Sequence, residues 1–324
     1  MSLSPSQSTI ALLGISTNSL LMFCVISNTP KVVKTYSILI FIHAIFDSLS
    51  CGLTVLTRPR TIIIGWAFTH PSIGYCKYFG ASTCGMGYAL IAHGYIYALY
   101  LILISFFYRF LILKNIHLRI KTLLFICFLF YIPCLLQAVF FHLSEGPADQ
   151  IYNVIHQEYP NYNLTGYVMS GTLNIISEYG AFGFGHMIFS PTIIFCFIIF
   201  LRRKIVRSLN RTGMSKNTKT IHRQLLKSLT IQAMLPQIDM LIVLSFVLQA
   251  LDIYSNPFFE ENTVVIALFV PLTTPCISLI FIKPYNIRVR KLLGLKVGNE
   301  DHGYGSTEKQ TITKITRLAN VRTI

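Results

Sequence analysis

The feature of this 324-residue chain that most limits its fold is a series of seven long, mostly apolar runs. A helix needs about 20 consecutive apolar residues to cross a bilayer, and each run reaches about that length. The runs are Thr9–Ser27, Ser37–Thr57, Phe79–Leu113, Thr122–Leu143, Gly180–Leu201, Leu225–Leu251 and Thr263–Ile282. The third run exceeds one crossing, so we expect its helix to tilt or to extend beyond the bilayer.

Composition supports this interpretation, because only 12% of the residues are charged and 53% are hydrophobic. A soluble protein carries about 25% charged residues. The predicted fold is therefore all-α, a bundle of seven transmembrane helices in a single domain. We divide the chain into an amino terminus (1–8), the helical bundle (9–282), a membrane-surface helix (283–293) and a disordered tail (294–324).

The basic residues gather on one side of the predicted membrane. All of the 27 Lys and Arg residues except Arg58, Arg60 and Lys77 fall on the side of alternate connections, either in these connections, at the adjoining ends of the runs or in the tail. Basic connections remain in the cytoplasm, so we expect an extracellular amino terminus and a cytoplasmic carboxyl terminus. The same pattern indicates that the net charge of +15 faces anionic membrane lipid and not nucleic acid.

After the seventh run, Asn286–Leu293 alternates apolar and basic residues. This pattern is typical of a short amphipathic helix on the inner leaflet. A basic stop signal next to the membrane is the alternative interpretation. The chain beyond Leu293 is polar and has no apolar period, so we expect disorder there.

The largest predicted outer loop is Ser144–Tyr179. It contains Asn163-Leu164-Thr165, an acceptor sequence for N-linked glycosylation on the expected outer side. Asn163 is therefore the candidate glycosylation site.

Three classes of seven-span protein compete: a receptor, a transporter and a channel. A transporter usually shows an internal repeat and several ionisable groups near the midplane, whereas only Asp47 and Asp239 are acidic within the runs. A channel would show a re-entrant filter or a ring of charge, and neither pattern is visible. The chain has no catalytic motif and no Cys/His spacing typical of a metal site, so we predict no enzymatic activity, no cofactor and no metal.

Several motifs decide among these classes. Asn18, Asp47 and the triplet Tyr108-Arg109-Phe110 resemble positions of the rhodopsin-type receptors. More closely, five stretches resemble the nematode serpentine chemoreceptors of class delta. They are Thr35-Tyr36-Ser37-Ile38-Leu39, Gly74-Tyr75-Cys76-Lys77-Tyr78-Phe79-Gly80, Leu103-Ile104-Ser105-Phe106-Phe107-Tyr108-Arg109-Phe110, His222-Arg223-Gln224-Leu225-Leu226-Lys227-Ser228-Leu229-Thr230-Ile231-Gln232-Ala233 and Lys283-Pro284-Tyr285.

The resemblance implies a chemosensory G-protein-coupled receptor. Its expected ligand is a small external molecule, an odorant or a pheromone, and its expected partner is a heterotrimeric G protein. Its expected location is the plasma membrane of a sensory neuron, in the cilia. The alternatives are a membrane transporter or channel, and an orphan seven-helix protein that no longer couples.

The residues expected to contact the G protein are Tyr108, Arg109, Arg223 and Lys227. Tyr108 stands where related receptors carry an acidic residue, and the sixth run opens with the basic Arg223 and Lys227. No carboxylate is therefore available there to pair with Arg109. Alternatively, Arg109 extends its charged end to the lipid headgroups.

The expected conformational switch comprises Asn18, Asp47, Pro236, Thr274, Pro275 and Ser278. Asp47 is a lone carboxylate near the middle of the second run, where such a group usually faces the bundle interior. The functional interpretation is a switch or a cation site. The alternative is a packing residue paired with His43, one helical turn away.

The candidate ligand pocket comprises Cys84, Tyr88, Ile91, Tyr95, His186 and Asp239. The first four share one face of the third helix, and the last two would add polarity. Packing between helices is the competing interpretation.

The outer loop Ser144–Tyr179 has no cysteine, so Cys76 cannot form the bridge to this loop that the receptor resemblance implies. We also expect Cys84 to lie too far along the third run to pair with Cys76 without distortion.

Overall fold

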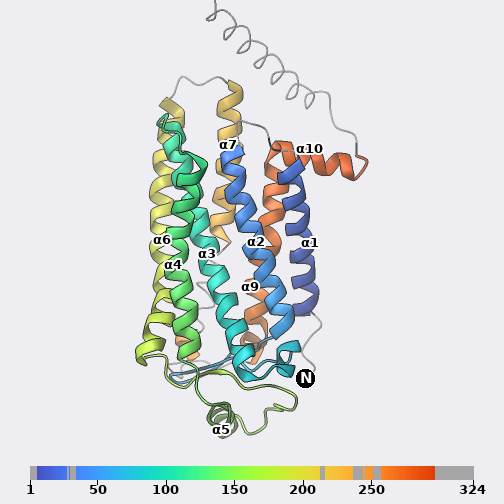
Figure 1. Ribbon diagram of the computed structural model, residues 1–324, viewed down its shortest axis with the longest axis vertical. Helices are drawn as coiled ribbons and strands as arrows, with labels where there is room; N and C mark the ends of the chain where they lie inside the picture. Colours follow the sequence, from blue (N-terminus) through green and yellow to red (C-terminus); the bar gives the residue numbers. More distant parts are fainter. Residues whose placement is uncertain are drawn as a thin grey trace, which may run out of the picture.

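Seven long helices run side by side in the computed structural model (Figure 1). The structure describes residues 6–27, 29, 34–211, 216–235, 244, 246–249, 251 and 257–295. The long helices are α1 (Ser6–Ser27), α2 (Lys34–Thr57), α3 (Ala81–Leu113), α4 (Ile120–Leu143), α6 (Glu178–Arg211), α7 (Lys216–Met234) and α9 (Pro257–Phe281). Three short helical segments accompany them: η2 (Tyr75–Tyr78), α5 (Ala148–Glu158) and α10 (Lys283–Leu292).

Six of these helices are long and apolar enough to cross a membrane, judged by their length and composition within the described residues. They are α1, α2, α3, α4, α6 and α9, and the apolar windows match six of the seven predicted runs. The sixth predicted run, Leu225–Leu251, begins in α7 and continues into a segment that is described only in part. The chain is a multi-pass membrane protein.

Helix α3 occupies the centre of the bundle and contacts α2, α4, α6 and α7. Two glycines allow α2 to approach it closely. A Cβ atom on Gly87 would collide with the Thr57 side chain, and one on Gly94 with the Ser50 hydroxyl. Small residues at such crossings let helix backbones pack tightly in membranes.

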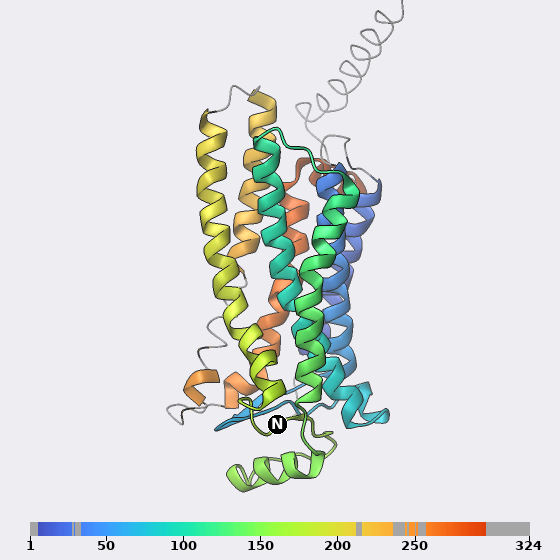
Figure 2. The ribbon, with the colours of Figure 1, turned by 60° about the vertical axis from the view of Figure 1, so that its left-hand side comes forward.

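The two ends of the bundle differ (Figures 1 and 2). At one end, here called the sheet end, lie three short strands and α5. The strands are β1 (Ile62–Ile64), β2 (Ala67–Thr69) and β3 (Gly171–Thr172), paired antiparallel in the order β1-β2-β3. At the opposite end, here called the α10 end, α10 follows α9 and contacts α1.

The described structure is mostly helical, as predicted, and the short three-stranded sheet is an element that the prediction did not include. Ile63 pairs with Phe68 across the hairpin, and Phe68 pairs in turn with Thr172 of the predicted outer loop. Strands of two or three residues are too short to show the alternation of apolar and polar residues that predicts a strand. The described connections at this end therefore form a folded cover over the sheet end of the bundle.

Cys76 and Cys84 form a disulfide, with their Cα atoms 5.1 Å apart, so the prediction that Cys84 lies too far along the run to pair with Cys76 without distortion was wrong. The expectation treated Cys84 as lying far along a continuous helix. Instead, η2 forms a separate turn before α3, and Gly80 reverses the chain with a φ of 99°. Helix α3 begins only at Ala81, which places Cys84 in its first turn beside Cys76.

Candidate functional site

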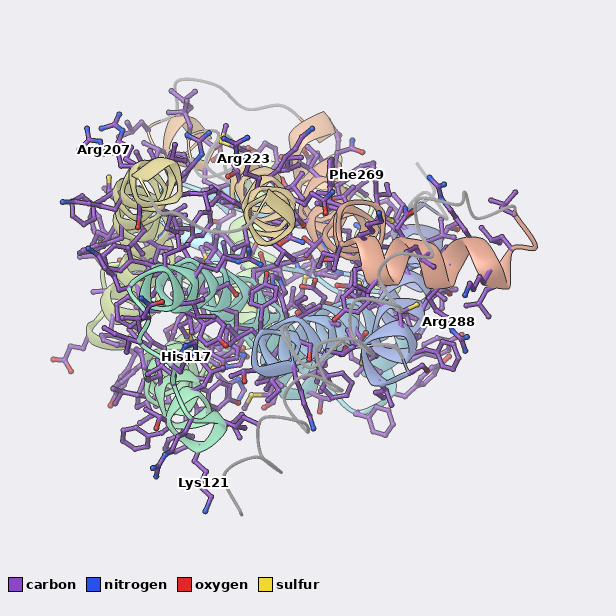
Figure 3. The ribbon with its side chains drawn as sticks, turned by 90° about the horizontal axis from the view of Figure 1, so that it is seen from above. His117, Lys121, Arg207, Arg223, Phe269 and Arg288 are labelled. Atoms are coloured by element: carbon purple, nitrogen blue, oxygen red, sulfur yellow. A yellow bond between two sulfur atoms is a disulfide. The ribbon has the colours of Figure 1, made fainter. Side chains whose placement is uncertain are left out.

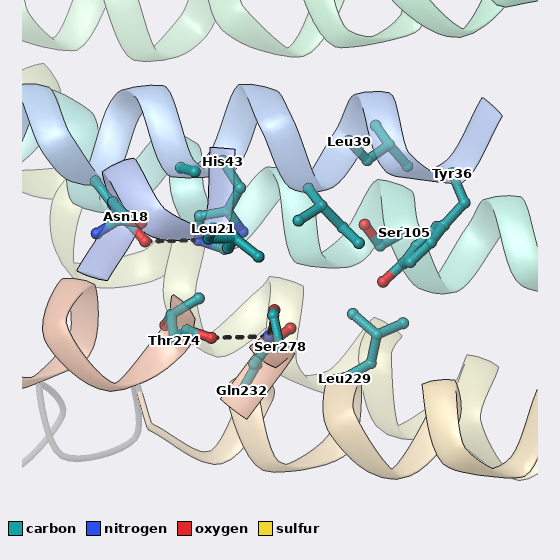
Figure 4. Close-up of a pocket in the computed structure, with 13 residues that line it drawn as sticks. Asn18, Leu21, Tyr36, Leu39, His43, Ser105, Leu229, Gln232, Thr274 and Ser278 are labelled. Carbon is teal, nitrogen blue, oxygen red and sulfur yellow. Dashed lines mark hydrogen bonds and ion pairs between the residues drawn. The ribbon is translucent and has the colours of Figure 1, made fainter. Parts of the chain in front are cut away.

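A polar chamber lies in the middle of the bundle, where five helices converge (Figure 4). Its volume is about 10 Å³ for the centre of a water molecule, which is room for a single water or a small ion. The lining residues come from α1, α2, α3, α7 and α9. They are Asn18, Leu21, Tyr36, Leu39, Ile40, His43, Ala44, Asp47, Ser105, Leu229, Gln232, Thr274 and Ser278.

Asp47 supplies the carboxylate of the chamber and is only 4% exposed. Its Oδ2 atom lies 3.6 Å from Nε2 of His43, one helical turn away. Neither atom has a hydrogen-bond partner within the described part of the chain. A buried carboxylate without partners is costly in an apolar environment, so this site favours a proton, a water or a cation beside Asp47.

Asn18 links α1 to α9 through the backbone of α9. Its side-chain amide donates to the carbonyl oxygens of Gly14, at 2.9 Å, and Pro271, at 2.8 Å. Pro275 has no N–H, so it cannot donate the helical hydrogen bond that the Pro271 carbonyl would otherwise accept. Asn18 therefore satisfies a carbonyl that the proline leaves free, and it ties α1 to the irregular part of α9.

Gln232 makes the corresponding link between α7 and α9. Its side-chain amide donates to the Ser278 hydroxyl at 2.8 Å and to the Thr274 carbonyl at 3.2 Å (Figure 4). Gln232 is 5% exposed. A movement of α7 away from α9 must therefore break two buried hydrogen bonds.

Arg109 lies in α3 toward the α10 end and is 3% exposed. Its guanidinium carbon lies 4.1 Å from the centre of the Tyr36 ring in α2. Tyr36 also stacks on Tyr108, with ring centres 6.3 Å apart. The three guanidinium nitrogens find no hydrogen-bond acceptor among the described residues, so the cation–π contact with Tyr36 is what stabilises the buried charge.

The cover at the sheet end rests on an aromatic cluster. Phe68 of β2 packs against Phe141 of α4 and Phe184 of α6, with ring centres 6.0 and 4.9 Å away. His70 stacks on Tyr88 of α3 at 4.3 Å and binds the Ser170 hydroxyl through Nδ1 at 2.8 Å. Burial lowers the pKa of His70 to about 3, so its ring is neutral.

A buried ion pair fastens the cover to α9. The Arg60 guanidinium donates to Glu260 at 2.9 Å, and the Tyr162 hydroxyl donates to the same carboxylate at 3.2 Å. The Arg60 guanidinium also lies 4.7 Å from the Tyr162 ring centre. Burial, followed by the charge of Glu260, raises the pKa of Tyr162 to about 12, so its hydroxyl keeps its proton and donates.

Comparison with known proteins identifies this architecture. The family described as "Serpentine type 7TM GPCR chemoreceptor Srd" matches residues 6–291. The chain belongs to the class delta serpentine chemoreceptor family. Serpentine receptor class delta-19 of Caenorhabditis elegans is 32% identical over 290 residues, which cover 87% of this chain and 85% of that receptor. Serpentine receptor class delta-18 of the same organism is 32% identical with 87% and 86% covered, and class delta-3 is 29% identical with 84% and 82% covered.

In this class delta receptor, the structure gathers four of the predicted switch residues. Asn18, Asp47, Thr274 and Ser278 line one chamber. Pro275 acts on the chamber through the carbonyl that Asn18 binds. Pro236 lies outside the described residues.

Sequence reasoning missed two residues of this site as functional candidates, Tyr36 and Gln232. Each carried a signal in the sequence. Gln232 is a polar residue inside an apolar run, and Tyr36 belongs to the stretch Thr35–Leu39 that resembles class delta receptors.

The predicted G-protein contacts of the class delta receptor do not form one cluster. Tyr108 and Arg109 are buried against Tyr36, whereas Arg223 and Lys227 are exposed on α7. Arg223 and Lys227 line a groove between α6 and α7 at the α10 end. Arg109 lines neither this groove nor the chamber.

The predicted ligand-pocket residues are also divided. Cys84 is in the disulfide, Tyr88 lies beneath the cover, and Ile91 is buried in α3. His186 of α6 bonds to Gln137 at 2.8 Å and to Tyr100 at 3.3 Å. Tyr95 is half-buried in α3, and Asp239 lies outside the described residues. None of the five described residues lines the chamber or the groove.

Proposed function

We propose that this chain is a chemosensory receptor that senses an external small molecule and signals to a heterotrimeric G protein. The match to the chemoreceptor family along residues 6–291 carries this proposal. The ligand would be an odorant or a pheromone, and the receptor would reside in the plasma membrane of a sensory neuron, in the cilia. Catalysis has no part in this function.

The proposed orientation places the sheet end outside the cell and the α10 end in the cytoplasm. The distribution of Lys and Arg supports it, since every described Lys and Arg except Arg58, Arg60 and Lys77 lies toward the α10 end. Asn163 is exposed at the sheet end, so a glycan can be attached there. Helix α10 carries basic and apolar residues in alternation, which suits the anionic inner leaflet.

The proposed pocket lies beneath the cover, among Tyr88, Ile91, Tyr95 and His186, and Asp239 stays a candidate from outside the described residues. A ligand bound there touches α3 and α6, whose opposite ends reach the cytoplasm in the proposed orientation. Binding energy that differs between two packings of these helices would shift the receptor toward the second packing.

The chamber and Arg109 would convert this shift into coupling. Separation of α7 from α9 would break the Gln232 hydrogen bonds and change the surroundings of Asp47. The same movement would uncover Arg109 for a G protein once its stack on Tyr36 opens.

Calcium imaging of cells that express the full chain with a promiscuous G protein, against a panel of volatile and water-soluble small molecules, tests the proposal. We expect at least one molecule to raise calcium in expressing cells and not in cells that express a serpentine receptor of unrelated sequence. A current that persists when G proteins are inhibited would instead indicate a channel. Ligand uptake without a second-messenger response would indicate a transporter.

A further inference from the structure

A groove opens between the ends of α6 and α7 at the α10 end, and its volume is about 350 Å³. Four aliphatic side chains, three cations and one threonine line it. The lining residues are Arg202, Val206, Leu209, Arg223, Leu226, Lys227, Thr230 and Ile231. Figure 3 shows Arg207 and Arg223 on the side of the bundle that α6 and α7 form, away from α4.

The groove lies at the level where the apolar part of α6 ends. Leu201 closes the apolar run and Arg202 opens the basic one. The Arg202 Nε donates to the Thr230 hydroxyl at 3.3 Å, and this hydrogen bond holds the Arg202 side chain next to α7. Arg223 and Lys227 share one face of α7, one helical turn apart. In a membrane, this level corresponds to the phosphates of the lipid headgroups.

The three cations of the groove carry uncompensated charge. No acidic residue lines the groove among the described residues. Arg202, Arg223 and Lys227 are exposed, and none of them forms an ion pair within the described part of the chain. A neutral or singly charged headgroup would leave much of this positive potential unbalanced.

The cations and the aliphatic side chains of the groove together suit a ligand that has both several negative charges and an apolar part. The Arg202 and Arg223 guanidinium groups can each donate two parallel hydrogen bonds to a phosphate, and Lys227 adds a point charge. Val206, Leu226 and Ile231 offer an apolar surface to a glycerol backbone and the first part of an acyl chain. We propose that this groove binds one phosphoinositide, an anionic phospholipid with additional phosphates on its inositol ring.

This lipid site is separate from the proposed ligand pocket, and it shares Arg223 and Lys227 with the residues predicted to contact the G protein. A lipid bound there bridges α6 and α7, so it stabilises the described arrangement of these two helices by mass action. Basic grooves between transmembrane helices on the cytoplasmic side suit such headgroups in general. The proposal can therefore be tested by measuring lipid binding alone, without an odorant or a G protein.

The experiment uses the purified full-length receptor in a neutral detergent. A phosphatidylinositol bisphosphate with a fluorescent acyl chain is titrated in, and fluorescence anisotropy reports binding. Competition by unlabelled phosphatidylserine and by soluble inositol trisphosphate separates general charge attraction and headgroup binding from lipid binding. We expect saturable binding that neither competitor displaces at equal concentration.

The groove variant combines Arg202→Gln, Arg223→Gln and Lys227→Gln. Since each interfacial cation contributes about fivefold, the triple substitution should weaken binding about a hundredfold. A matched control combines Lys114→Gln, Arg119→Gln and Lys121→Gln, which removes three exposed cations outside the groove at the same end. We expect the control to bind within about twofold of the wild type.

Three results would overturn the proposal: equal loss in the control variant, equal displacement by phosphatidylserine, or equal affinity for soluble inositol trisphosphate. The melting temperature of each variant without lipid serves as the folding check. If the triple variant does not fold, Arg223→Gln with Lys227→Gln, both exposed on α7, tests the same site. Undiminished binding by that double variant would reject the groove.

Discussion

Asp47 and Arg109 are both buried ionisable side chains, and their surroundings differ. Asp47 faces a chamber that has space for one water or ion, whereas Arg109 lies on the face of Tyr36. Related receptors that carry an acidic residue before this arginine can hold it in an ion pair. Here Tyr108 occupies that position, and a ring from α2 takes over the contact.

The first residue-scale prediction concerns Arg109. Arg109→Ala should abolish ligand-stimulated second-messenger output while ligand binding and surface expression stay close to wild type. Arg109→Lys should recover little, because an ammonium group cannot reproduce the planar donor fork. Tyr36→Leu should act in the opposite direction and raise basal output, since it removes a cation–π contact that contributes about 1 kcal/mol.

Tyr36→Phe is the matched control for this series, because it retains the aromatic ring. Surface protein is measured by labelling intact cells, and output by a second-messenger reporter. Undiminished output from Arg109→Ala at normal surface levels would reject Arg109 as the coupling residue and would favour a channel or a transporter.

The second prediction concerns Asp47. Asp47→Asn keeps the size of the side chain and loses its charge, so a switch residue should show a change in ligand potency of about tenfold with little change in surface expression. Asp149→Asn is the control, since Asp149 lies in the exposed outer helix α5. Dose–response curves of both variants measure the ligand potency and so test whether Asp47 is a switch residue. Normal potency and normal expression of Asp47→Asn would leave only a packing role.

At the scale of elements, the cover at the sheet end depends on a few buried polar contacts. β1 and β2 have three residues each and β3 has two, so their ladder alone is weak. The ion pair of Arg60 with Glu260 and the aromatic cluster around Phe68 supply the remaining attachment.

Glu260→Gln should therefore loosen the cover. The Glu260 carboxylate is 1% exposed, and removing one partner of a buried ion pair costs about 3 kcal/mol, because the other charge stays buried. We expect a lower melting temperature for the purified receptor and faster proteolysis of the segment between α4 and α6. Glu158→Gln, on the exposed side of α5, is the control. Equal melting temperatures for both variants would show that the pair does not hold the cover.

A pH-dependent contact lies beside the disulfide. The Glu145 carboxylate packs on Gly85 of α3 and lies 3.1 Å from Nδ1 of His142 in α4. Burial raises the pKa of Glu145 to about 7, although the hydrogen bond and charge of His142 lower it. The folded state thus binds a proton that the unfolded state, with a pKa of about 4.3, releases earlier.

Because the Glu145 pKa is higher in the folded state than in the unfolded state, the stability of the folded state decreases as the pH rises. The contribution of Glu145 to stability is fully present below its unfolded pKa and is lost as the pH rises through about 7. The melting temperature of the wild type should fall across this interval more than that of Glu145→Gln, which stays neutral. Melting curves in matched buffers provide the measurement. Parallel pH profiles of the two proteins would contradict the prediction.

At the scale of the whole molecule, the long helices were predictable, because each apolar run must match the thickness of a bilayer. The gathering of Asn18, Asp47, Thr274 and Ser278 was also predictable in part, since polar residues inside such helices face the interior. The contact of Arg109 with Tyr36 could not be predicted from the sequence, because it depends on which helix faces this part of α3. The sheet and the Cys76–Cys84 pair depend on short turns, whose geometry no periodic pattern reports.

The orientation of the whole bundle provides the last prediction. An epitope tag before Met1 should bind antibody on intact cells, and a tag after Ile324 should bind only after permeabilisation. The physical reason is that every described Lys and Arg except Arg58, Arg60 and Lys77 lies toward the α10 end, and the membrane insertion machinery retains connections rich in such residues in the cytoplasm. Asn163→Gln gives an independent readout, because loss of a glycan at the sheet end should increase the electrophoretic mobility of the receptor. Asn210→Gln, on the α10 side, should leave the mobility unchanged. The reverse pattern of tags, together with a mobility shift for Asn210→Gln, would invert the topology and remove the basis for an external ligand and an internal G protein.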